Sequence, residues 1–258
     1  MSGPSTGANG AVTVRKCETL QEMQACVALQ KEVWKFADAD LIPLRMFVAA
    51  AKIGGQVVGA FLASELIGFA LAIPATRNGH CYLHSQMLAV GQQHRNSGLG
   101  RRIKLHQRED ALARGFDLME WTFDPLEIKN AYLNIEKLGA IARRYNVDQY
   151  GITSSPLQGG LPTDRLVAEW WMRSKRVEAV LAGTPPAFEC RVRIDVPVEI
   201  YAWKAEAATR AKALAVQERN RVMLSEALAD GLVVLGYERD DRGNGLFLLG
   251  DWDEKWEY

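Results

Sequence analysis

The chain has 258 residues, 48% of them hydrophobic, and its 31 basic side chains balance 31 acidic ones. This length and composition are typical of a globular protein with one large domain, or with one domain and an appendage. The zero net charge argues against a nucleic-acid partner. The lack of a long apolar run and of a secretory signal argues against a membrane partner and against export. We therefore expect a cytoplasmic protein.

The first half of the chain predicts strands and helices in alternation. Residues 1–11 predict a disordered tail. Thr19 and Glu22 have the spacing of a capping box, Pro43 predicts a second helix start, and Asn78-Gly79 predicts a tight hairpin. The expected strands are 12–17, 56–63, 66–75 and 80–90, and the expected helices are 20–36 and 44–53.

The second half predicts a longer series of elements than a minimal domain needs. An amphipathic helix follows residue 98, and Asp124-Pro125 ends the next strand. The polar segment 151–162 predicts a lid-like loop. The expected strands are 116–123, 141–149, 166–172, 187–196, 232–239 and 245–252, and the expected helices are 130–140 and 199–230. The four cysteines are scattered, so free thiols and no metal site are expected.

The turn after the strand 80–90 has the most informative sequence. Arg95 to Gly100 reads Arg-x-x-Gly-x-Gly and leads directly into a helix. Unpaired backbone N–H groups and the helix dipole make such a turn a site for a pyrophosphate. A Walker A loop would need Lys at Arg101, and a Rossmann fingerprint would need Gly or Ala at Ile103. A tight turn and a surface helix without a ligand remain the alternative.

This pattern, behind a strand that ends Leu-Ala-Val, resembles the acetyl-CoA signature of the GNAT acyltransferases. The resemblance implies an α/β GNAT fold over residues 12–184, in which helices flank a mixed, mostly antiparallel, twisted sheet. A C-terminal extension of strands and one long helix, residues 185–258, would pack on that sheet or continue it. The resemblance also implies that acetyl-CoA or another acyl-CoA is the cosubstrate. The residues that it places at this cofactor are Leu88, Ala89, Val90, Arg95, Asn96, Ser97, Gly98, Leu99, Gly100, Arg101 and Asn130.

The helix NAYLNIEKLGA resembles the GNAT helix that packs beside the pantetheine arm. The family tyrosine that often protonates the leaving thiolate falls at Ile135, and Tyr132 lies one turn earlier as an alternative acid. The blocks LHSQM, WTFDPL, NAYLNIEKLGA and PTDRL resemble a narrower GNAT subfamily over residues 12–258. Kinship with it implies N-acylation of amino acids by acyl-CoA, succinyl-CoA among them.

Few residues are needed for amine acylation, and the sequence offers candidates for each role. His84 is the candidate general base, because its usual pKa suits catalysis near neutrality; a structural histidine is the alternative. Asn134 is a second candidate for catalysis, to orient the thioester or the sulfur, and a solvated helix face is its alternative. The candidates for binding the acceptor are Glu120, Asp164 and Arg165.

These expectations combine into one function and its rivals. The main prediction is the transfer of an acetyl or succinyl group from acyl-CoA to the amine of a small molecule, an amino acid among the candidates. The attack is expected to be direct, without an acyl-enzyme. The alternatives are a non-catalytic acyl-CoA sensor or assembly protein, and O-acylation. A homodimer is one option for the assembly.

Overall fold

The structure is a computed structural model that describes residues 11–151 and 153–256. The expected disordered tail lies outside the described residues, except for Ala11. The N-terminal elements are β1 (Val12–Lys16), α1 (Leu20–Trp34), η1 (Asp38–Asp40), α2 (Leu44–Lys52), β2 (Gln56–Leu62), β3 (Glu65–Arg77), β4 (His80–Val90), η2 (Gln92–His94), α3 (Leu99–Ala113) and β5 (Leu118–Phe123).

The elements after β5 include a helix that changes type along its length. The short α-helix α4 (Ile128–Tyr132) continues directly into a π-helical turn, η3 (Leu133–Lys137). The remaining elements are β6 (Ile141–Asn146), η4 (Pro156–Gln158), β7 (Arg165–Trp171), α5 (Lys175–Leu181), β8 (Val192–Val196), α6 (Ile200–Ala205), α7 (Arg210–Ala229), β9 (Val233–Arg239) and β10 (Gly245–Gly250).

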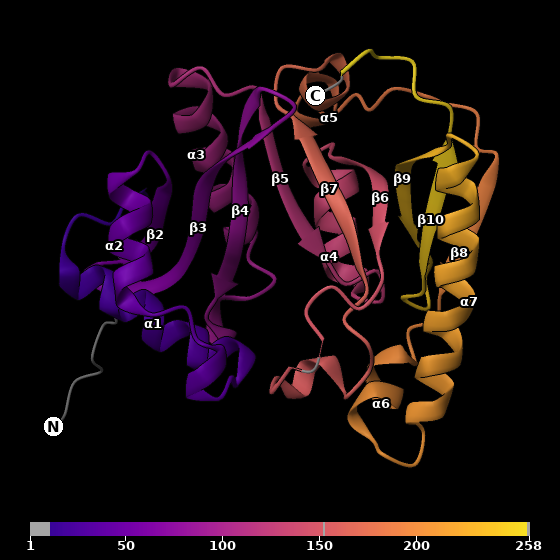
Figure 1. The fold of residues 1–258 in the computed structure, drawn as a ribbon, viewed down its shortest axis with the longest axis horizontal. Coiled ribbons are helices and arrows are strands. Elements are labelled where there is room, and N and C mark those ends of the chain that lie inside the picture. Colours follow the sequence, from indigo (N-terminus) through magenta and orange to yellow (C-terminus); the bar gives the residue numbers. More distant parts are fainter. Residues whose placement is uncertain (1–10, 152, 257–258) are drawn as a thin grey trace, which may run out of the picture.

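All of these strands join one open sheet, in the order β1-β2-β3-β4-β5-β7-β6-β9-β10-β8. The pairing of β4 with β5 is parallel, and the other strand pairs that the structure describes are antiparallel. The strands β8, β9 and β10 thus continue the sheet of the N-terminal part (Figure 1). None of the described helices is long and apolar enough to cross a membrane.

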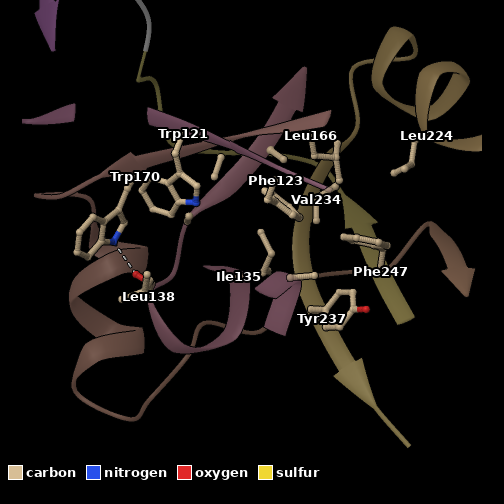
Figure 2. Packing of buried hydrophobic residues seen from close by; sticks show 14 of the residues in the cluster. Trp121, Phe123, Ile135, Leu138, Leu166, Trp170, Leu224, Val234, Tyr237 and Phe247 are labelled. Atoms are coloured by element: carbon tan, nitrogen blue, oxygen red, sulfur yellow. Dashed lines mark hydrogen bonds between the residues drawn. The ribbon is translucent and has the colours of Figure 1, made fainter. Parts of the chain in front are cut away.

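Helices cover both faces of the sheet. On one face, α1 and α2 pack against β2, β3 and β4 around Phe47 and Phe69. On the other face, Leu99 and Ile103 of α3 pack against β2 and β3. The largest cluster lies further along the sheet and joins β5, β7, α4 and the C-terminal strands, as Figure 2 shows. There the indole of Trp170 donates a hydrogen bond to the carbonyl of Leu138 at 2.7 Å.

Three local predictions are confirmed. Thr19 and Glu22 form the reciprocal capping box at the start of α1. Pro43 precedes α2 as its N-cap residue. The hairpin between β3 and β4 turns at Asn78 and Gly79, which both adopt a positive φ, 48° and 81°. The first nine main elements follow the predicted order β-α-α-β-β-β-α-β-α.

The prediction of one helix over residues 199–230 is wrong, because α6 and α7 are separated by a break from Glu206 to Thr209. The break contains no glycine or proline, so tertiary contacts override helix propensity. Lys204, at the end of α6, is buried and its ammonium lies 2.9 Å from Asp124 and 3.0 Å from Glu127. This pairing holds α6 beside the end of β5, whereas α7 runs along β6 and β8.

Candidate functional site

The strands β4 and β5 separate in the middle of the sheet. Their shared register is limited to two pairs, Leu83 with Met119 and His84 with Glu120. Beyond His84, β4 pairs with β3 as far as Val90 but has no described partner on its β5 side. The parting strands leave an opening whose edge carries unpaired backbone groups of β4, including those near Leu88.

A β-bulge lies where this opening begins. Leu71 pairs with Met87 and Ala72 pairs with Ser85, so Gln86 is the extra residue on β4. His84 and Ser85 point to opposite faces of the sheet, as strand alternation requires. Ser85 points towards α3, where its hydroxyl accepts a hydrogen bond from the ammonium of Lys104 at 2.8 Å. His84 points to the face that carries α1 and α2.

Lys104 also lies in this region, although the sequence did not predict it as a residue of the site. It is 2% exposed, its ammonium lies 3.7 Å from the ring centroid of Trp121, and it contacts the sulfur of Met119 at 3.8 Å. Burial lowers the pKa of Lys104 well below its usual value. The side chain therefore bridges β4 and β5 at the point where they part, without an acidic partner among the described residues.

The turn after β4 offers backbone donors to a ligand. Within the described residues, no acceptor bonds the amide groups of Ser97, Leu99, Gly100 or Arg101, and α3 begins without a side-chain cap. Gly98 is the N-cap residue of α3 and has a φ of 80°, which favours glycine. An added Cβ at Gly98 would meet no atom within 4 Å, so this turn is open to solvent.

The segment from α4 to η3 packs beside this turn through three contacts. The ammonium of Lys129 lies 3.5 Å from the side-chain oxygen of Asn96. A Cβ at Gly100 would lie 3.7 Å from both Leu133 and Leu88. The third contact is a hydrogen bond of 3.2 Å from the Arg101 guanidinium to the Lys137 carbonyl. The turn, the free part of β4 and the α4–η3 segment therefore surround one volume. Lys129 was not predicted, although its side chain adds a positive charge there.

Asn134 lies in the π-helical turn and is 2% exposed, so a solvated helix face does not describe it. Its side-chain nitrogen is buried and has no hydrogen-bond acceptor among the described residues. Single π-turns inside helices are frequent at functional sites. Ile135, the position of the family tyrosine, is fully buried in the core near Phe123 (Figure 2). Asn130 is exposed on α4.

His84 and Glu120 face each other across the opening's base. Burial lowers the pKa of His84, while the charge of Glu120 opposes this shift. The imidazole is therefore neutral at pH 7 and able to accept a proton. Glu120 is 1% exposed, and its carboxylate accepts hydrogen bonds from the guanidinium groups of Arg77 and Arg144.

The other predicted residues lie away from this opening. The Tyr132 ring lines a hollow against β9 and β10, where Lys137 and Arg239 lie over it. Asp164 is fully buried, and its carboxylate is bonded by Tyr145, Arg221 and the amide of Asp148. Asp164 therefore joins β6, β7 and α7 within the fold.

Arg165 is the first residue of β7, and its side chain contacts residues that are near it in the sequence. Its guanidinium donates hydrogen bonds to the carbonyl of Asp164 and the side chain of Gln158, and lies 5.5 Å from the ring centroid of Tyr150. The Tyr150 hydroxyl lies 3.0 Å from that of Thr122 on β5. Arg165 is thus connected to the end of β5 through Tyr150.

The loop after α1 contacts the loop before β7. Ser154, in the predicted lid-like loop, bonds to Asp40 and accepts a hydrogen bond from the amide of Ala37. Ser155 donates to the carbonyl of Trp34 at 2.7 Å. The segment between α1 and α2 is therefore connected to the segment between β6 and β7.

No protein-family description and no curated protein matches this sequence. Solved structures do match it. The ribosomal-protein-S18-alanine N-acetyltransferase from Escherichia coli is 15% identical, with a TM-score of 0.50 over 64% of this chain and 97% of that one. The protein yncA from Salmonella typhimurium, solved with its cofactor acetyl-CoA, is 15% identical, with a TM-score of 0.52 over 64% of this chain and 96% of that one.

The matched part covers about two thirds of this chain, so about a third of it has no counterpart in either structure. At this level of identity the likeness concerns the fold. The part of the chain that these structures match has the fold of the GNAT acetyltransferases.

Proposed function

We propose that this protein transfers an acyl group from acyl-CoA to the amine of a small molecule. The observation that carries the proposal is the uncapped start of α3 beside the opening between β4 and β5. Free amide groups at a helix N-terminus bind pyrophosphate, and the parted strands leave backbone donors for a thioester carbonyl. The fold shared with GNAT acetyltransferases supports this use of the opening.

The cosubstrate would bind with its pyrophosphate at residues 95–101 and its pantetheine arm between β4 and the α4–η3 segment. The unpaired side-chain nitrogen of Asn134 would then donate a hydrogen bond to the thioester or to the leaving sulfur. The residues present suit this role, because Gly98 and Gly100 leave the backbone accessible and Lys129 adds a charge beside the turn.

Amine acylation requires a neutral nucleophile. His84 would remove a proton from the acceptor ammonium, since burial keeps its imidazole neutral near pH 7. The amine nitrogen would attack the thioester carbonyl carbon and form the C–N bond, and the carbonyl oxygen would gain negative charge. As the carbonyl re-forms, the C–S bond would break, and the leaving thiolate would take up the proton that the nitrogen loses, giving the amide and free CoA thiol. An amino acid is the proposed acceptor class, and acetyl and succinyl groups are the proposed acyl groups.

The test is the release of free thiol from acetyl-CoA and from succinyl-CoA in the presence of a panel of amino acids and other amines. We expect His84→Ala to lower the rate about 100-fold or more while CoA affinity stays unchanged. Binding of CoA without thiol release would favour the non-catalytic sensor, and release with hydroxyl acceptors alone would favour O-acylation. The absence of CoA binding in calorimetry would contradict the proposal as a whole.

A further inference from the structure

A hollow of about 750 Å³ lies between the α4–η3 segment and the C-terminal strands. Tyr132 and Glu136 line it from the helical side. The ends of β8 and β9 and the turn between β9 and β10 line it from the other side. The hollow is thus formed jointly by the part of the chain that carries the candidate site and by the C-terminal strands.

Two cations lie around the ring of Tyr132, and one of them, Arg239, lines the hollow itself. The ammonium of Lys137 lies 5.0 Å from the ring centroid, and the guanidinium carbon of Arg239 lies 5.7 Å from it. Within the described part of the chain, neither cation forms a salt bridge with an acidic side chain. Because both residues are exposed, an anion from solvent can reach them.

Most acidic groups of the hollow already have partners. The salt bridges and hydrogen bonds that engage them are Asp195 with Arg219, Glu238 with Arg193, Glu136 with the amide of Tyr237, and Asp240 with the turn before β10. Glu199 and Arg242 also line the hollow, and neither forms a salt bridge among the described residues. The positive charges beside Tyr132 therefore remain available to a ligand.

Tyr237 supplies an unpaired polar group to the same hollow. This residue is 1% exposed, and its hydroxyl has no hydrogen-bond partner among the described residues. Figure 2 shows the ring in the core cluster, with the hydroxyl at the edge of that cluster. The hydroxyl lies over Gly245, where the absence of a Cβ leaves it room. A buried hydroxyl without a partner is unusual in a native fold and points to a ligand.

The cations lie next to the turn that would hold the pyrophosphate. Lys137 accepts a hydrogen bond from Arg101 through its backbone carbonyl, and Leu133, beside Tyr132 in the chain, packs near Gly100. An anion bound at the start of α3 would therefore have Lys137 and Arg239 on the side of the C-terminal strands.

We infer that this hollow binds the 3′-phosphoadenosine end of coenzyme A. Lys137 and Arg239 would hold the 3′-phosphate, and the adenosine would lie in the hollow, within reach of the hydroxyl of Tyr237. This inference rests on the proposed acyl-CoA function. It assigns the C-terminal strands a share in cofactor binding and gives Tyr132 the role of supporting the two cations instead of protonating the thiolate.

The test compares the affinities of CoA and 3′-dephospho-CoA by calorimetry on the full chain. Since charge-assisted contacts to a phosphate are strong, we expect CoA to bind at least about 10-fold more tightly. Arg239→Gln and Lys137→Gln should each reduce this ratio while the affinity for 3′-dephospho-CoA stays unchanged. The matched control is Arg191→Gln, which removes an exposed arginine just before β8 that is paired with Asp251 outside the hollow and should keep the wild-type ratio.

The possible outcomes distinguish a failure of this inference from a failure of the proposed acyl-CoA function. Equal affinities for the two ligands in the wild type would overturn the inference and leave the acyl-CoA proposal intact. Binding of neither ligand would contradict the acyl-CoA proposal itself. If one glutamine variant does not fold, as judged by its thermal unfolding, the other still tests the ratio. An unchanged ratio in a folded Arg239→Gln protein would exclude that residue from the phosphate site.

Discussion

His84 on β4 and Glu120 on β5 form the last pair of residues that the two strands share before they separate. The pair joins a half-buried imidazole to a buried carboxylate that Arg77 and Arg144 also contact. Burial lowers the pKa of His84 and the charge of Glu120 raises it. The pKa of the proposed base is therefore lowered mainly by burial, and its neighbour Glu120 partly offsets this effect.

This pair predicts a pH dependence with a definite sign. His84 acts as a base only when neutral, so the rate should fall as the pH drops through its lowered pKa, below the usual 6.5. Glu120→Gln removes the charge that raises this pKa, so the acid limb of the rate profile should move to still lower pH. The measurement is kcat/KM from pH 5 to 8 for both proteins. The control is Asp117→Asn, since Asp117 is paired with His80. An acid limb that stays in place or moves to higher pH would contradict the assignment of His84.

The turn before α3 allows a test with a matched control. Gly98 and Gly79 have nearly the same φ, 80° and 81°, and an added Cβ would meet no atom within 4 Å at either position. Alanine at each should destabilise the fold similarly, by about 1–2 kcal/mol, because both adopt the left-handed conformation. Gly98→Ala should in addition weaken CoA binding, since its Cβ faces the proposed pyrophosphate, whereas Gly79→Ala lies in a hairpin remote from the turn. Thermal unfolding and calorimetry measure the two effects. Equal CoA affinity in both variants would argue against a ligand at this turn.

The sequence predicted the part of the site that depends on short-range patterns. The strand 80–90, the turn Arg95–Gly100 and the start of α3 are local features, and the structure has them in place. The break before α7 was not predictable, because Lys204 finds its partners Asp124 and Glu127 far along the chain.

The burial of two residues near the opening could not be predicted from sequence patterns either. Asn134 and Lys104 are polar residues on helices, where an exposed position is the usual expectation. Both are buried, the first in a π-helical turn and the second between two parting strands. Their burial depends on how elements pack, for which a single sequence contains no periodic signal.

The buried Lys104 predicts that stability depends on pH in a specific way. Its pKa is lowered in the folded state, so between that lowered pKa and about 10.4 the unfolded chain binds a proton that the folded chain does not. The free energy of unfolding should therefore rise with pH between pH 7 and 9, by up to about 1.4 kcal/mol per unit from this residue. Lys104→Met should remove that contribution, whereas Lys175→Met, on the exposed start of α5, should leave it. Urea unfolding at both pH values measures the difference. The same pH dependence in wild type and Lys104→Met would show that this lysine stays charged.

Asn134→Leu should separate stability from activity. The side-chain nitrogen of Asn134 is buried without a partner, and such a group destabilises a fold by about 1–3 kcal/mol. Leucine has a similar shape and no polar atom, so the variant should unfold at the same temperature as the wild type or a higher one. If the nitrogen donates to the thioester or to the leaving sulfur, the same variant should lose kcat by about 10-fold or more, with little change in CoA affinity. The control is Asn146→Leu, at the exposed end of β6. A more stable protein with unchanged kcat would show that Asn134 has no part in the reaction, and the hydrogen-bond donor to the thioester would then have to be sought at the free edge of β4.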